Sequence, residues 1–251
     1  RTMLGALAST KDVGIYDQAL KLVNILLTLV TSLGSVMLPR VAHLLVTGDY
    51  KAVNKMHEMS FLVYNLVIFP MMAGILIVND DFVQFFLGQD FQDARYAIAI
   101  MIFRMFFIGW TNIMGIQMLI PHNQNKEFMI STTAPAIISV GLNLLFLPKL
   151  GYIGAAIVSV LTEALVWAIQ LYFTSRYLKE VPIIGSMTKI VLASAIMYGI
   201  LLGSKTVIHF SPTLNVLVFA VLGGIISLNF WPAESASTIN GCLTPLGFGV
   251  I

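Results

Sequence analysis

The chain has 251 residues, of which 58% are hydrophobic and only 10% are charged. A soluble domain carries about 25% charged residues, so this surplus of apolar side chains exceeds what one soluble core can hide from water. The net charge is +2, the basic residues are scattered, and the single cysteine, Cys242, allows no disulfide within the chain. These values indicate a membrane protein and argue against a nucleic-acid-binding domain.

Seven segments are long and apolar enough to span a bilayer, which takes about 20 residues per helix. In chain order they are Ile15–Leu38, Met59–Val78, Tyr96–Ile120, Phe128–Leu147, Ile153–Phe173, Met187–Ile208 and Leu214–Phe230. We therefore expect an all-α, polytopic membrane helix bundle of about seven full transmembrane helices plus a stub. The stub is residues 1–10, which begin in mid-pattern and predict that an N-terminal part is missing. The segment Val46–Met59 is polar and mildly amphipathic, so we expect it to lie along the membrane surface.

The basic residues between the predicted spans are divided unequally between the two sides of the membrane. Seven lie on one side (Arg40, Lys51, Lys55, Lys126, Arg176, Lys179 and Lys189) and four on the other (Lys11, Arg95, Lys149 and Lys205). The positive-inside rule assigns the richer side to the cytoplasm. The seventh predicted span ends on that side, so the C-terminus is expected to be cytoplasmic.

The sequence lacks the short motifs that mark soluble enzymes. It contains no phosphate-binding glycine loop with its lysine, no HExxH, no CxxC and no GxSxG. We therefore predict that the protein is not an enzyme and needs neither a metal nor a cofactor.

Glu163 is an acidic residue in the middle of an apolar segment. It lies 12 residues after Gly151, roughly 18 Å along a helix, at a depth where an acidic residue costs about 2.5–3.5 kcal/mol. Gly151, Ala155 and Ser159 precede it at a spacing of four, and such a stripe allows a neighbouring helix to pack closely. Two interpretations stay open: Glu163 is an anchor between helices, or it couples transport to an ion.

Other charged or polar residues in the predicted spans are candidates for lining a cavity. Arg104 either extends to the membrane interface or faces an aqueous cavity, where its guanidinium suits phosphate. Lys21 begins a polar stripe that continues through Asn24 and Thr28. Arg1 and Gln117 complete the set of candidate substrate-binding residues.

Four stretches in series carry a resemblance to a known family. They are RTMLGALASTKDVGIYDQALKLVNI, SLGSVMLPRVAHL, NIMGIQMLIPHNQNKEF and LGYIGAAIVSVLTEALVWAIQLY. Together they resemble the polysaccharide-repeat flippases of the multidrug, oligosaccharidyl-lipid and polysaccharide exporter superfamily. The resemblance implies that residues 1–230 are the C-terminal transmembrane lobe of a two-lobe exporter. Residues 231–251 match nothing in the family and are interpreted as a cytoplasmic tail or an aberrant end.

The resemblance also implies a function. Such a protein moves undecaprenyl-diphosphate-linked oligosaccharide repeats from the cytoplasmic to the outer leaflet, for capsule or exopolysaccharide biosynthesis. It implies a multi-pass protein of the bacterial inner or plasma membrane, with the lipid-linked oligosaccharide, the bilayer and a polysaccharide polymerase as partners. The alternative is a cation-coupled multidrug extruder of the same fold.

Overall fold

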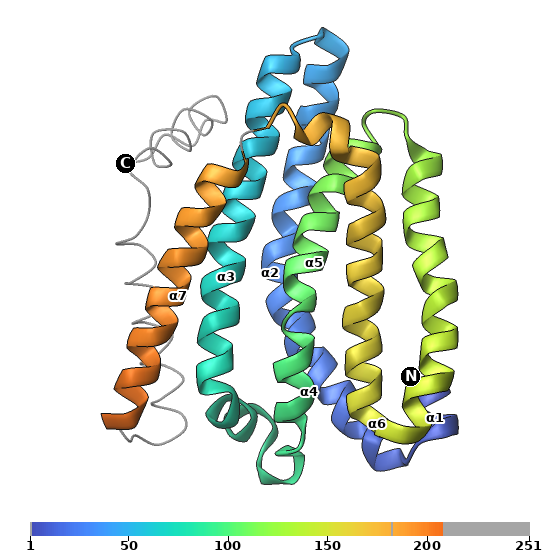
Figure 1. Ribbon diagram of the computed structural model, residues 1–251, viewed down its shortest axis with the longest axis vertical. Coiled ribbons are helices and arrows are strands. Elements are labelled where there is room, and N and C mark those ends of the chain that lie inside the picture. Colours follow the sequence, from blue (N-terminus) through green and yellow to red (C-terminus); the bar gives the residue numbers. More distant parts are fainter. Residues whose placement is uncertain (1, 182, 208–251) are drawn as a thin grey trace.

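The computed structural model describes residues 2–181 and 183–207, and every regular element among them is a helix. Figure 1 shows the described helices standing side by side along the long axis of the molecule. Three of them, Tyr50–Leu87, Ala94–Leu119 and Asn125–Leu178, are long and apolar enough to cross a membrane. Arg1, the predicted span Leu214–Phe230 and the tail 231–251 lie outside the described residues.

A sharp corner separates α1 (Thr2–Leu7) from α2 (Thr10–Thr47). Ser9 caps the N-terminus of α2: its hydroxyl oxygen accepts the backbone N–H of Asp12, whose carboxylate accepts the backbone N–H of Ser9. Such a capping box satisfies two N–H groups that the first turn of a helix leaves unpaired. The chain therefore turns within two residues, and α1 folds back beside α2.

The α2–α3 hairpin is longer than the predicted spans. Helices α2 and α3 (Tyr50–Leu87) have 38 residues each, about 57 Å at 1.5 Å per residue. Gly48 ends α2 in the left-handed conformation with φ 76°, and the carboxylate of Asp49 caps α3 by accepting the N–H of Ala52. The prediction that residues 46–59 lie along the membrane surface is wrong, because this two-residue turn continues directly into α3. The turn of this hairpin is the uppermost part of the described chain in Figure 1.

The third predicted span is one path made of three helical pieces. After a 3₁₀ turn, η1 (Gln89–Phe91), come α4 (Ala94–Met101), α5 (Arg104–Thr111) and the π-helix η2 (Asn112–Leu119). π-helical runs are rare in proteins, and those that occur are often found at functional sites. Its wider turn buries Gln117 completely, and the amide oxygen of Gln117 accepts the hydroxyl of Ser60 on α3 at 2.7 Å.

The fourth and fifth predicted spans form one element, α6 (Asn125–Leu178), which is bent at Gly151. Gly151 has φ 51° and ψ −129°, a backbone conformation that side chains with a Cβ rarely adopt. Just beyond it, a Cβ on Gly154 would lie 2.7 Å from the carbonyl oxygen of Phe146. These two glycines therefore let the halves of α6 run side by side, as the yellow-green and gold segments of Figure 1.

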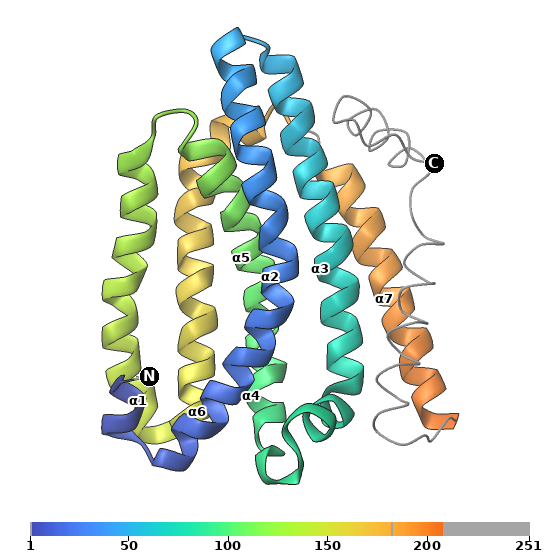
Figure 2. The ribbon, with the colours of Figure 1, turned by 180° about the vertical axis from the view of Figure 1, so that it is seen from behind.

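The last described helix, α7 (Ile183–Val207), lies beside α3, as both Figure 1 and Figure 2 show. The core between α3, α5 and α6 contains a cluster of aromatic rings. Trp110 lies 4.8 Å from Phe61 and 6.3 Å from Trp167 between ring centroids, and its indole N–H donates to Asn65 at 3.0 Å. This packing fixes α5 between the other two helices.

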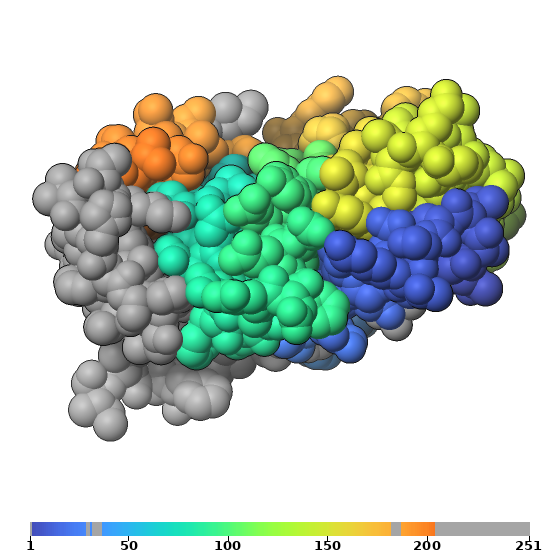
Figure 3. Space-filling view, turned by 90° about the horizontal axis from the view of Figure 1, so that it is seen from below, coloured from blue at the N-terminus to red at the C-terminus, as the bar shows by residue number. Residues whose placement is uncertain are grey.

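The connections fall at two opposite ends of the bundle. The turns at 48–49 and 120–124 lie at the upper end of Figure 1, and the corner at 8–9, the segment 88–93 and the bend of α6 lie at the lower end. Seen from that lower end, Figure 3 shows blue α1 against the yellow-green half of α6. Which of the two ends faces the cytoplasm stays a prediction from the basic residues.

An orientation experiment follows from these positions. Lys51 and Gln89 are both exposed and lie at opposite ends of the bundle. In a Cys242→Ser background, Gln89→Cys should react with a membrane-impermeant thiol reagent added to intact cells, whereas Lys51→Cys should react only after the cells are opened. The opposite labelling pattern would reverse the predicted orientation.

Candidate functional site

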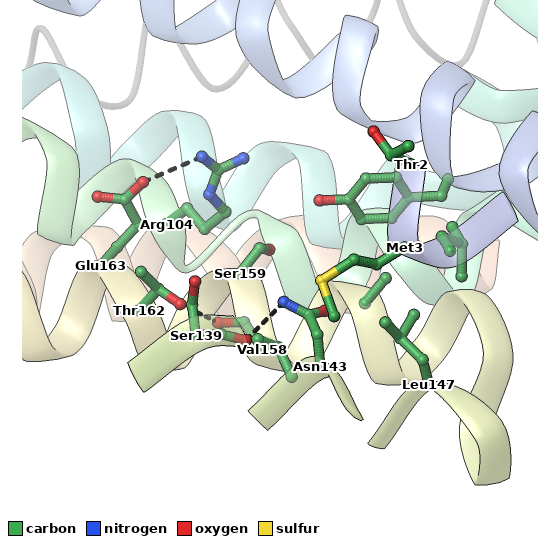
Figure 4. A pocket seen from close by; sticks show the side chains of 13 residues that line it. Thr2, Met3, Arg104, Ser139, Asn143, Leu147, Val158, Ser159, Thr162 and Glu163 are labelled. Atoms are coloured by element: carbon green, nitrogen blue, oxygen red, sulfur yellow. Dashed lines mark hydrogen bonds and ion pairs between the residues drawn. The ribbon is translucent and has the colours of Figure 1, made fainter. Parts of the chain in front are cut away.

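A cavity of about 330 Å³ lies between α1, α2, α5 and the two halves of α6. Figure 4 shows Arg104 and Glu163 at one end of it and Thr2, Met3 and Leu147 at the other. The lining residues with polar side chains are Thr2, Tyr16, Arg104, Ser139, Asn143, Ser159, Thr162 and Glu163. The cavity therefore has both polar and apolar walls, and it is partly open to its surroundings.

Arg104 and Glu163 form an ion pair at the polar end of this cavity. The Nη2 of Arg104 donates to the Oε1 of Glu163 at 3.1 Å, and the two side chains are only 14% and 24% exposed. The dashed line between them in Figure 4 marks this contact. Because water reaches the pair poorly, the two charges attract each other more strongly than a surface pair would.

The breaks in the helices bring the two charged residues together. Arg104 begins α5 just after the interruption at Ile102 and Phe103, and Glu163 follows the bend at Gly151 by three turns of α6. At 1.5 Å per residue Glu163 lies roughly 18 Å from that bend, beyond half of a hydrocarbon core about 30 Å thick. The ion pair is thus placed well inside the bundle.

The hydrogen-bonding groups of the cavity are mostly acceptors. The hydroxyls of Ser139, Ser159 and Thr162 donate to carbonyl oxygens of their own helix. Their oxygens keep free lone pairs toward the cavity. The Nε and Nη1 of Arg104 are buried and have no hydrogen-bond partner among the described residues. Because neighbouring atoms cover these two nitrogens, a bound molecule reaches them only when the guanidinium moves.

The residues that line the cavity indicate which kind of ligand suits it. Among the described residues, no group of three His, Cys, Asp or Glu side chains is arranged to hold a metal ion. The lining residues contain an ion pair, hydroxyls and one amide, and the acceptor oxygens among them suit a ligand whose hydroxyl groups can donate to them.

The structure places the predicted site residues in three different surroundings. Arg104 and Glu163 meet in the cavity, which favours the interpretation that Arg104 faces a cavity over the one in which it extends to the membrane interface. Gln117 is wholly buried elsewhere, where its backbone carbonyl lies 3.1 Å from the Nε2 of His57. Packing between α3 and η2 therefore accounts for its polar side chain.

The predicted polar stripe of α2 lies outside the cavity. Lys21, Asn24 and Thr28 are exposed, and the hydroxyl of Thr28 donates to the backbone carbonyl of Asn24. Arg1 lies outside the described residues. The roles of these four residues in substrate binding stay predictions.

The small residues before Glu163 lie in different surroundings. Ala155 is 7% exposed and packs closely against Leu4 of α1 and Leu147 of the first half of α6, as predicted, whereas Ser159 lines the cavity. Gly151 was expected on the same stripe and forms the bend of α6. The two halves of α6 also meet far from the bend, where the amide N–H of Gln170 donates to the hydroxyl oxygen of Ser131 at 3.2 Å.

Sequence reasoning missed Ser139, Asn143 and Thr162. A signal existed for the first two, because they are four residues apart on a helix whose neighbouring residues are apolar, with the same spacing as the stripe on α2. Asn143 also donates its amide N–H to the backbone carbonyl of Ser139. No feature of the sequence showed that this face lies opposite Arg104.

The apolar helices indicate a multi-pass membrane protein, and a cavity with several polar lining residues lies between them. Residues 1–96 match the family described as "Polysaccharide biosynthesis protein". The chain is 21% identical over 227 residues to the "Probable low-salt glycan biosynthesis flippase Agl15" of Haloferax volcanii, a match that covers 89% of the chain and 47% of that protein. It is 27% identical over 171 residues to the "Putative O-antigen transporter" of Escherichia coli K12, a match that covers 68% of the chain and 41% of that protein.

The fold is also similar to that of a solved structure, "Lipid II flippase MurJ, inward closed conformation". The TM-score is 0.74 at 18% identity, and the match covers 93% of the chain and 48% of that structure. The chain thus spans about half the length of the proteins it matches. In sequence the chain is thus similar to proteins of polysaccharide biosynthesis and glycan transport, and in fold it is similar to a lipid II flippase.

Proposed function

We propose that the protein moves a lipid-linked oligosaccharide across the plasma membrane, with the cavity as part of the path. The observation that carries this proposal is a polar cavity with a paired arginine, Arg104, deep inside a bundle of apolar helices. The physical barrier to such transport is the cost of placing sugar hydroxyls and phosphate charge in hydrocarbon. A polar cavity lowers that cost, while the lipid tail of the substrate stays in the bilayer.

The substrate we propose is an undecaprenyl-diphosphate-linked repeat unit for capsule or exopolysaccharide, delivered to the outer leaflet for a polymerase. Arg104 brings a positive charge to the lining of this cavity, and a guanidinium is well suited to phosphate oxygens. Lys21, exposed on α2, and Arg1 would attract the diphosphate at the entrance. Glu163 keeps Arg104 in place and limits the positive charge of the cavity.

We also propose that residues 1–230 form the C-terminal lobe of a two-lobe exporter, with seven full spans, a stub and a cytoplasmic C-terminus. The chain spans about half the length of its relatives, which supports this proposal. A second lobe facing α2 would cover Lys21, Asn24 and Thr28, which are exposed here. That polar stripe would then border a central cavity and would not face lipid.

Transport in proteoliposomes tests the function. The complete two-lobe exporter that we propose should carry a fluorescent lipid-diphosphate oligosaccharide across the bilayer, measured by a quencher that cannot cross it. The Arg104→Lys variant should transport the lipid more slowly, because lysine keeps the positive charge but lacks the planar set of N–H donors of a guanidinium. The double variant Arg104→Gln with Glu163→Gln should lose the movement although its charges stay balanced.

Two controls accompany this measurement. A phospholipid without sugar should not move faster in any variant than in protein-free vesicles. Unchanged movement of the glycolipid in the double variant would show that the charged pair in the cavity is not part of the transport path. Export of a cationic dye without movement of the glycolipid would instead favour a multidrug extruder.

A further inference from the structure

The corner between α1 and α2 forms one end of the cavity. Thr2, Met3 and Leu4 of α1 line it together with Tyr16 of α2. Leu4 packs against Leu147 and Ala155, one from each half of α6, and these three side chains are 2%, 1% and 7% exposed. The cavity is therefore polar near Arg104 and closed by apolar contacts where α1 meets the bend of α6.

One carboxylate connects this corner to the bend. The Oδ2 of Asp12 accepts the backbone N–H of Ser9 at 3.1 Å and the Ser9 hydroxyl at 2.6 Å, within the corner itself. Its Oδ1 accepts the backbone N–H of Tyr152 at 3.4 Å, just after the bend. Asp12 thus accepts N–H groups at the starts of two helical segments, although Asp12 and Tyr152 are 140 residues apart in the chain.

The bend of α6 is shaped to receive this carboxylate. A Cβ on Gly151 would lie 2.8 Å from the Oδ1 of Asp12, so only glycine leaves the space that the carboxylate fills. The backbone N–H groups that begin the second half of α6 carry partial positive charge and favour an anion there. The hydrogen bond from the Ser9 hydroxyl lowers the pKa of Asp12 below its ordinary value of 3.8, so the carboxylate is charged at neutral pH.

We propose that Asp12 is a positioning residue that fastens the α1–α2 corner to the bend of α6 and so keeps this end of the cavity closed. Its contacts join the α1–α2 corner to the bend of α6, next to the apolar cluster of Leu4, Leu147 and Ala155. Releasing the bond to Tyr152 lets α1 move away from Leu147 and Ala155, and opens the cavity toward the end of the bundle that carries the connections 8–9 and 88–93. Any role of this opening in transport rests on the proposed function. The proposal that Asp12 holds this end of the cavity closed does not.

A matched pair of variants at position 152 isolates the hydrogen bond. Tyr152→Pro removes the backbone N–H at the start of a helix, where proline is well accepted, together with the side chain. Tyr152→Ala removes the same side chain and keeps the N–H. The difference between the two variants therefore reports the contact with Asp12 and excludes the packing of the tyrosine ring.

The measurement is the rate at which a cysteine in the cavity reacts with a charged methanethiosulfonate reagent. The cysteine is introduced as Ser159→Cys in the Cys242→Ser background, in the full chain held in lipid nanodiscs. Tyr152→Pro should react roughly tenfold faster than Tyr152→Ala, the shift expected when one charge-assisted hydrogen bond no longer favours the closed state. Relative to the wild type, Asp12→Ala should raise the rate at least as much as Tyr152→Pro raises it relative to Tyr152→Ala.

A third variant separates closure from folding. Asp12→Asn keeps one oxygen, which can serve either Ser9 or Tyr152 but not both, so its labelling rate should lie between those of the wild type and Asp12→Ala. All variants should show the same elution volume and the same helical content by circular dichroism. Equal rates for Tyr152→Pro and Tyr152→Ala would overturn the proposal, and this result would leave the glycolipid measurement in proteoliposomes unaffected.

Discussion

Gly154→Ala is expected to lower the stability of the protein by about 3 kcal/mol, at the upper end of the usual cost of overpacking. The added Cβ would lie 2.7 Å from the backbone oxygen of Phe146 and 3.1 Å from the Cβ of Leu150. Neither atom is the end of a flexible side chain, so the two halves of α6 must move apart. The melting temperature of the purified protein in detergent, followed by tryptophan fluorescence, measures the loss.

Gly141→Ala is the matched control for this substitution. Gly141 lies in the first half of the same helix, and no described atom lies within 4 Å of the position its Cβ would take. Alanine there should leave the melting temperature unchanged or raise it slightly, because alanine favours a helix over glycine by up to about 1 kcal/mol. Equal melting temperatures for Gly154→Ala and the wild type would show that the halves of α6 are not in contact at Phe146.

Removing one member of the Arg104–Glu163 pair should destabilise the protein by about 3 kcal/mol. The pair is mostly shielded from water, with side chains 14% and 24% exposed, and breaking a buried pair leaves a charge without compensation. Glu163→Leu should have the larger effect, since it also removes an acceptor, and Glu163→Gln a smaller one. This expectation differs from that for a simple anchor, in which glutamine would preserve the fold fully.

A double variant separates the charge from the shape of the site. Arg104→Gln with Glu163→Gln removes both charges and keeps polar groups on both helices, so it should recover most of the stability that either single variant loses. Melting temperatures of the four proteins form a double-mutant cycle. Additive losses in the double variant would contradict a direct interaction between the two side chains.

The helical membrane bundle follows from the sequence through composition alone, because hydrocarbon leaves a spanning segment few structures other than a helix. The predicted span Met59–Val78 lies within the much longer helix α3, and Tyr96–Ile120 corresponds to three helical pieces with a break at Ile102 and Phe103. Hydropathy indicates which residues tolerate lipid and not where a helix stops. The stops depend on caps such as Ser9 and Gly48, whose conformations are set by local hydrogen bonds.

The sequence by itself determined that Arg104 and Glu163 are costly at their depth and therefore need an internal partner. Only the tertiary structure decided that each is the partner of the other, because they lie 59 positions apart and meet through a break before α5 and a bend in α6. The same bend separates Asn143 from Ser159 in the chain and brings both to one cavity. Periodicity describes one helix at a time, whereas a cavity is defined by the faces that several helices turn toward one another.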